Sequence, residues 1–227
     1  MRILALETTE RVGSVAAWHD DKLLLQRDLA PDEQSARSLA PGLRDLLGQV
    51  GWRPGEVELV AVSRGPGSFT GLRVGVTVAK TFAYAVGAEI LGVDTLETIA
   101  AGAPDVVFRL AVAVDAQRGD VMAQPFERGE DGWLRPVEPA RLMPAGEWFA
   151  GLSSGWNVSG PVLRKLLGRV PSQVVALDAA CWRPTAANVA RLAARDHAAG
   201  RRTDLWGLVP HYSRRPAAEE KWAKRRE

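Results

Sequence analysis

The stretch from Leu59 to Gly87 constrains the fold of this 227-residue chain more strongly than any other. Leu59 to Val62 is an apolar run with the β-branched content of a buried strand, and the turn-forming segment 64–68 (RGPGS) interrupts it. A helix with Thr70 as its N-cap is predicted to follow. The stretch therefore predicts a strand, a tight turn and a helix in direct succession.

The predicted helix carries a row of small residues four positions apart, and residues at this spacing stack along one side of a helix. Each interior glycine costs a helix about 1 kcal/mol relative to alanine, so we expect the close approach of another backbone to compensate. The residues alone leave open whether the same chain or a second chain covers the row. It consists of Gly71, Gly75, Ala79, Ala83 and Gly87.

The order of the predicted elements indicates two α/β lobes. Three strands come first, and helices then alternate with strands up to the segment Gly102-Ala103-Pro104, which marks a boundary. A second strand-rich start follows, with an apolar run that ends at Asp115 and another strand after a short turn. We therefore predict a first lobe over residues 1–104 and a second lobe over 105–227.

Composition narrows the class of protein. A single cysteine, Cys181, excludes a disulfide framework or a Cys-based metal cluster within one chain, and it fits a reducing cytoplasm. No apolar run approaches the roughly 18 to 20 residues of a membrane helix, and the first residues lack the layout of a secretory signal. The segment 211–227 is basic, with six Lys or Arg against three Glu, as in a solvated tail or one that touches phosphates.

The motifs of known catalytic and nucleotide sites do not fit. The glycines of segment 65–71 match neither the phosphate-loop nor the dinucleotide-binding spacing. The three histidines stand far apart, so a helix-borne zinc site is unsupported. Glu7 and Asp115 end corresponding strands of the two lobes, where catalytic carboxylates can face a cleft, but hydrogen bonds to their own turns are the favoured explanation.

Five segments resemble the bacterial YeaZ/TsaB family of proteins, which act in forming threonylcarbamoyladenosine on tRNA. The resemblance runs in order over nearly the whole chain, and the first of the segments is long enough to be specific. They are SRGPGSFTGLRVGV at 63–76, ILALETTE at 3–10, GVDTLETIA at 92–100, VDAQRGDVMAQPF at 114–126 and VPHYSRRPAAEEKW at 209–222.

The resemblance implies a two-lobed fold of the actin, Hsp70 and sugar-kinase class (ribonuclease H-like), each lobe a mixed sheet with helices, with the C-terminal tail able to return to the first lobe. It also implies a catalytically degenerate paralogue that supports a TsaD-like transferase in a complex completed by a TsaE-like ATPase. Alone, the chain would form a homodimer. It would have no catalytic residue, metal or cofactor of its own, would meet ATP, ADP and Mg only within the complex, and would contact tRNA indirectly or weakly.

The resemblance further implies that partners join through two helices of the first lobe, here 34–50 and 70–87, so docking of a second chain becomes the favoured explanation of the small-residue row. Glu7, Thr8, Thr9 and Asp115 are the residues assigned to any nucleotide contact. The predicted interface residues are Ser35, Ser38, Leu39, Gly42, Thr70, Gly71, Arg73, Val74, Gly75, Val78, Ala79, Phe82 and Ala83.

Two departures from the family pattern affect these expectations. The first strand ends in Glu7 where the family commonly has Asp, and Gln34-Ser35 stands where a histidine often precedes the first helix.

The alternative hypothesis is an ATP-dependent phosphotransferase or ATPase of the same fold class, with Glu7 and Asp115 flanking a nucleotide. A metallopeptidase would need metal ligands that the sequence does not offer.

Overall fold

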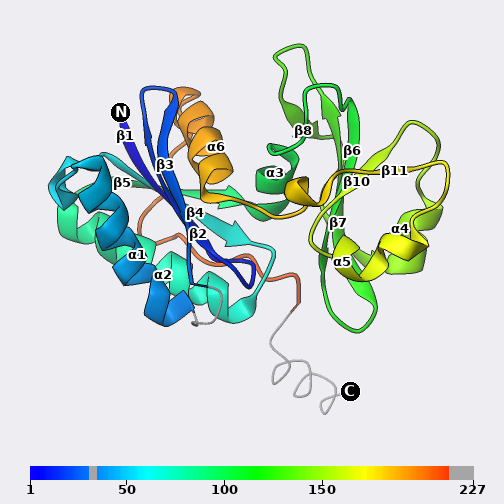
Figure 1. The fold of residues 1–227 in the computed structure, drawn as a ribbon, viewed down its shortest axis with the longest axis horizontal. Helices are drawn as coiled ribbons and strands as arrows, with labels where there is room; N and C mark the ends of the chain where they lie inside the picture. The colour runs from blue at the N-terminus through cyan, green and yellow to red at the C-terminus, as the bar shows by residue number, and fades with distance from the viewer. Residues whose placement is uncertain (31–34, 215–227) are drawn as a thin grey trace.

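The computed structural model describes residues 1–30 and 35–214, and it shows two lobes, each built on its own β-sheet (Figure 1). The first sheet has the strand order β3-β2-β1-β4-β5, and the second has the order β11-β10-β6-β7-β8 with β9 paired to β7. The predicted two-lobed α/β arrangement is therefore confirmed. The elements that precede the predicted boundary are β1 (Arg2–Glu7), β2 (Ser14–His19), β3 (Lys22–Asp28), α1 (Ser35–Val50), η1 (Pro54–Glu56), β4 (Leu59–Gly65), α2 (Phe69–Val86), β5 (Glu89–Asp94) and α3 (Thr95–Ala100). Of these, α3 packs its buried side chains in the core of the second sheet, so the first lobe ends before the predicted boundary.

β1 lies at the centre of the first sheet, antiparallel to β2 and parallel to β4. Its side chains alternate between two cores, as the pleat of a strand requires. Leu4 and Leu6 face the core on the side of α1 and α2, whereas Ile3 and Ala5 face the opposite side. Because both faces of the sheet are covered, the strand reads as one continuous apolar run.

α2 follows β4 after the predicted tight turn, but its N-cap is Ser68 rather than Thr70. The Ser68 hydroxyl accepts a hydrogen bond from the Gly71 N–H at 3.2 Å, which satisfies one of the donors that a helix start leaves unpaired. α2 lies beside α1 on the same face of the first sheet (Figure 1). The two predicted docking helices therefore do form one surface layer.

The second lobe repeats the strand-rich start of the first. β6 and β7 form a hairpin at the boundary that was predicted, and short helices cover the sheet. The elements of this part of the chain are β6 (Arg109–Asp115), β7 (Asp120–Arg128), β8 (Leu134–Pro136), β9 (Arg141–Pro144), α4 (Ala145–Ala150), β10 (Asn157–Ser159), α5 (Leu163–Leu166), η2 (Leu167–Arg169), β11 (Val175–Ala176) and η3 (Ala179–Cys181).

The chain then returns to the first lobe. α6 (Ala186–Ala198) packs on the face of the first sheet opposite α1 and α2, where its apolar side chains complete the core around Ile3 and Ala5. Leu208 is buried on the other face, in the core that contains α2. The predicted second-lobe range of 105–227 is therefore too long, because its last described part, from α6 onward, belongs to the first lobe. No helix among the described residues has the length and apolarity to cross a membrane.

Candidate functional site

The first four residues of the small-residue row face the interior of the first lobe, whereas Gly87 is exposed at the C-cap of α2. A Cβ atom added at Gly71 would overlap the carbonyl oxygen of Thr8, and one added at Gly75 would overlap the Thr8 hydroxyl. That hydroxyl donates a hydrogen bond to the Gly71 carbonyl at 2.8 Å. Ala79 and Ala83 are buried in the core of the same lobe. The interpretation that a second chain covers this row is therefore wrong, since the loop after β1 occupies it.

Three predicted interface residues of α1 also point inward. Ser38 and Leu39 are buried, and a Cβ atom added at Gly42 would lie 2.6 Å from a methyl group of Leu29. The assignment of Ser38 and Leu39 to a partner contact is wrong because they pack within this lobe. Gly42 is partly exposed, so its role in docking stays a prediction. The side chain of Ser35 lies outside the described residues.

The other predicted residues lie on the outer side of α2 or at its edge. Thr70 and Arg73 are exposed, and Val74, Val78 and Phe82 are partly exposed, so their role in docking stays a prediction. Sequence reasoning missed the outer row of α1. The residues of this row are three or four positions apart, and that spacing was the available signal. The row consists of Arg37, Pro41, Arg44 and Gly48, which are all exposed. Together the two outer rows form what we call the α1–α2 face.

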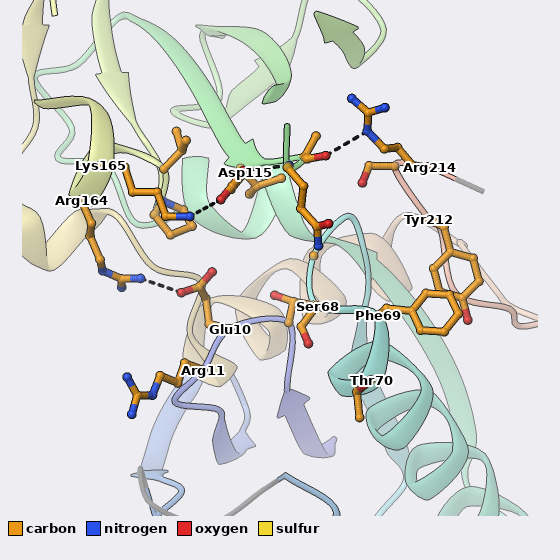
Figure 2. A pocket seen from close by; sticks show the side chains of 18 of the residues that line it. Glu10, Arg11, Ser68, Phe69, Thr70, Asp115, Arg164, Lys165, Tyr212 and Arg214 are labelled. Carbon is orange, nitrogen blue, oxygen red and sulfur yellow. Dashed lines mark hydrogen bonds and ion pairs between the residues drawn. The ribbon is translucent and has the colours of Figure 1, made fainter. Parts of the chain in front are cut away.

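A cleft of about 780 Å³ separates the two lobes (Figure 2). The first lobe contributes the turn after β1 and the start of α2, and the second lobe contributes the β6–β7 turn and the start of α5. The C-terminal segment forms the remaining wall. The lining residues are Thr9, Glu10, Arg11, Gly67, Ser68, Phe69, Thr70, Val114, Asp115, Ala116, Gln117, Arg118, Pro161, Val162, Arg164, Lys165, Tyr212, Ser213 and Arg214.

Glu7 does not line this cleft, because its side chain is fully buried at the end of β1. One carboxylate oxygen accepts hydrogen bonds from the backbone N–H and the hydroxyl of Thr9, and the other has no hydrogen-bond partner among the described residues. Burial raises the pKa of Glu7 to about 7, although the two bonds from Thr9 oppose the rise. Thr8 is buried against α2, so Thr9 is the only one of Glu7, Thr8 and Thr9 that reaches the cleft.

The buried carboxyl predicts a pH-dependent difference between the wild-type protein and Glu7→Gln. In the folded state Glu7 keeps its proton up to a pH of about 7, whereas in the unfolded state it loses the proton near pH 4.5. The stability that this proton contributes is therefore complete below pH 4.5 and is lost as the pH rises through about 7. Glutamine carries no charge to bury. We therefore expect Glu7→Gln to gain up to about 3 kcal/mol relative to wild type between pH 4.5 and pH 8.

Thermal melting of both proteins across that range measures this gain. Glu130→Gln, which removes an exposed carboxyl of the second lobe, is the control. A difference between Glu7→Gln and wild type that stays constant with pH would contradict a buried carboxyl with a raised pKa.

The acidic residues of the cleft are held by neighbouring cations. Lys165 donates a hydrogen bond to Asp115 at 2.6 Å, and Arg164 of the second lobe bonds Glu10 of the first at 2.7 Å (Figure 2). Burial alone would raise the pKa of Asp115, but the hydrogen bonds from Lys165 and from the Gln117 N–H hold that pKa below its ordinary value. Asp115 is therefore an ionised carboxylate whose charge is already compensated.

The residues assigned to a nucleotide are only partly placed at the cleft. Glu7 is buried, and Asp115 is paired with Lys165. Among the described residues there is also no group of three or more His, Cys, Asp or Glu side chains that could hold a metal ion. Of the four assigned residues, the structure places only Thr9 and Asp115 at the cleft.

The C-terminal segment ties the start of α2 to both lobes. The rings of Tyr212 and Phe69 lie 4.6 Å apart, and the Tyr212 hydroxyl accepts a hydrogen bond from Arg73. Lys80 donates to the carbonyls of Trp206 and Leu208 from one side of α2. Arg214 then reaches the second lobe, where it bonds the carbonyl of Ala116 at 2.9 Å. We call residues 205–214 the C-terminal strap.

Comparison with known proteins gives matches over nearly the full chain. Residues 30–144 match the family described as TsaD: tRNA N6-adenosine threonylcarbamoyltransferase. The tRNA threonylcarbamoyladenosine biosynthesis protein TsaB of Escherichia coli is 32% identical over 97% of this chain and 98% of its own length. The protein of the same name from Bacillus subtilis is 29% identical over 98% of each chain.

A solved structure supports the same relationship. YeaZ from Pseudomonas aeruginosa superposes with a TM-score of 0.82, at 28% identity, over 93% of this chain and 99% of that one. The implied two-lobed α/β fold, with a mixed sheet and helices in each lobe, is thereby confirmed.

Proposed function

Because the chain belongs to the YeaZ/TsaB family of tRNA threonylcarbamoyladenosine biosynthesis proteins, we propose that it is the non-catalytic partner of a TsaD-type transferase. Its role is in the formation of threonylcarbamoyladenosine on tRNA. In the proposed complex the chain supplies a docking surface to the transferase, and the transferase carries out the chemistry.

The observation that carries this proposal is the α1–α2 face. Two long neighbouring helices present their outer rows on the same side of the sheet, with Val74, Val78 and Phe82 partly exposed between polar residues. A mixture of apolar side chains and arginines is typical of protein interfaces. Since the inner rows are fully engaged within the lobe, a partner would contact only these outer positions.

The state of the cleft supports a non-catalytic role. Glu7 is buried and its nearest donors belong to Thr9, while Glu10 and Asp115 are each paired with a cation. None of these acids is presented as a general base or as a ligand for a catalytic metal. The alternative, a phosphotransferase or ATPase, would need acids that face the cleft without these partners.

The remaining parts of the proposal follow from the family. A TsaE-like ATPase completes the complex, and ATP or ADP with Mg²⁺ enters only there. In the absence of the transferase, the same α1–α2 face pairs two copies of this chain in a homodimer, as an exposed self-complementary surface can do. Contact with tRNA is weak or indirect, and the tRNA substrate assigns the protein to the cytoplasm.

Reconstitution of tRNA modification tests the proposal. The chain is mixed with its own organism's TsaD-type transferase, the other components of the pathway and unmodified tRNA, and the modified nucleoside is measured by mass spectrometry. We expect co-elution of the two proteins in gel filtration, and a loss of at least about tenfold in modification rate when this chain is omitted. Modification at full rate without it would contradict a partner role, and activity of this chain without the transferase would show that it is an enzyme.

A further inference from the structure

A second cavity lies in the second lobe, on the face of its sheet that α4 covers (Figure 1). It shares no lining residue with the interlobe cleft, and its volume of about 310 Å³ is at the small end of the range for small-molecule sites. Small side chains leave this space open. Ala111 of β6 and Ala123 of β7 line it from the sheet, where larger apolar residues would fill it.

The side walls of the cavity are apolar and are held in place by their neighbours. The ring centroids of Trp148 and Phe149 lie 4.7 Å apart, and the guanidinium carbon of Arg109 lies 4.3 Å from the ring centroid of Trp156. We call the cavity lined by Trp148, Trp156 and Met143 the α4 pocket. Aromatic rings and a thioether make favourable contacts with another aromatic ring, so this lining suits an aromatic ligand.

Charges of both signs line the α4 pocket without contacting each other. Arg141 supplies a guanidinium, and Glu138 and Glu147 supply carboxylates, all on exposed side chains. None of these three side chains has an ion pair or a hydrogen bond with any residue that the structure describes. Elsewhere in the same lobe opposite charges do pair, as Arg109 and Glu127 do at 3.1 Å. A ligand that carries both charges can bridge the unpaired groups of the pocket.

We propose that the α4 pocket binds a free amino acid with an aromatic side chain. The ring packs against Trp148 and Trp156, the carboxylate accepts hydrogen bonds from Arg141, and the ammonium group donates to the carboxylates of the pocket. The apolar walls alone would accept any hydrophobic group, whereas the unpaired charges select a zwitterion. The α4 pocket shares no residue with the α1–α2 face, so this inference does not rest on the proposed partner role.

Methyl NMR of the full chain tests the proposal, because its methionines report the site directly. The chain has three methionines, of which Met143 lines the α4 pocket, whereas Met1 and Met122 do not. We expect L-phenylalanine to shift the Met143 signal alone and to saturate at millimolar concentration or below, as ligands of this size do. Phenethylamine lacks the carboxylate and phenylpropionate lacks the ammonium group, so each should bind at least about tenfold more weakly.

Two variants assign the charges to their partners. Arg141→Ala should weaken the binding of L-phenylalanine at least about tenfold but should not weaken that of phenethylamine, which has no carboxylate to lose. Glu138→Gln/Glu147→Gln should weaken L-phenylalanine to a similar extent and should not weaken phenylpropionate. Arg135→Ala is the matched control, since it removes an exposed arginine of the same lobe that does not line the pocket.

Three results would overturn the proposal. In the first, L-phenylalanine at millimolar concentration leaves the Met143 signal in place or shifts the Met1 and Met122 signals equally. In the second, phenethylamine or phenylpropionate binds as tightly as L-phenylalanine, which would show that the pocket does not recognise both charges. In the third, Arg135→Ala loses as much affinity as Arg141→Ala. The affinity for the transferase is measured separately, so failure here leaves the proposed function untouched.

Discussion

Replacing Gly71 with alanine is expected to destabilise the protein by about 3 kcal/mol, because the new methyl group overlaps the backbone carbonyl of Thr8. A backbone atom cannot rotate away as a side chain can, so either α2 or the loop after β1 has to shift. That shift would also break the 2.8 Å hydrogen bond between the Thr8 hydroxyl and the Gly71 carbonyl. For a chain of this size the expected fall in melting temperature is about 6 to 12 °C.

Gly48→Ala is the matched control for this experiment. Gly48 is also a helical glycine, but no atom lies within 4 Å of the position of an added Cβ. Alanine there should stabilise α1 by up to about 1 kcal/mol. If Gly71→Ala instead kept the wild-type melting temperature and lost only the binding of a partner, the small-residue row would have to be a docking surface after all.

Arginine at Ala85 or at Thr81, one turn earlier on α2, is expected to weaken binding to the TsaD-type transferase by at least about a hundredfold. Both positions are exposed and lie three residues after Val78 and Phe82 of the α1–α2 face, so the long charged side chain does not disturb the core. In the complex the new arginine would be buried against the transferase without an acidic partner. An uncompensated buried charge costs several kcal/mol. Biolayer interferometry with immobilised transferase measures the affinity.

The control is Ala150→Arg, which adds the same charge at an exposed alanine in α4 of the second lobe. Circular dichroism should show that all three variants are folded, and gel filtration should show whether the α2 variants also lose self-association. Wild-type affinity in both α2 variants would exclude the α1–α2 face as the docking site, although it would leave the family membership untouched.

Much of the fold was predictable because the periodicity of the chain is clear. The apolar run of β1, the strand–turn–helix unit of β4 and α2, and the hairpin of β6 and β7 all occur where the sequence indicated them. The sequence of α6 has clear helical periodicity, but that periodicity shows only that one face is apolar. It cannot show which of two sheets that face will cover, and α6 covers the first.

The site was less predictable because its contacts join residues far apart in the chain. The spacing of Gly71 and Gly75 indicates that these two small residues lie on one side of a helix. Only the structure shows that Thr8, more than sixty positions earlier, fills the space beside them. The pair of Glu10 with Arg164 spans 154 positions. No local pattern indicates that the acids of the cleft are already paired with cations.

The return of the chain to the first lobe sets an order on folding during synthesis. A ribosome delivers β1 to β5 first, but the sheet that these strands form has one face bare until α6 arrives nearly a hundred residues later. Leu208 follows later still and closes the core beneath α2. The first lobe therefore begins to leave the ribosome before the second but completes its core after it. Its exposed apolar sheet is the part of the nascent chain most in need of a chaperone.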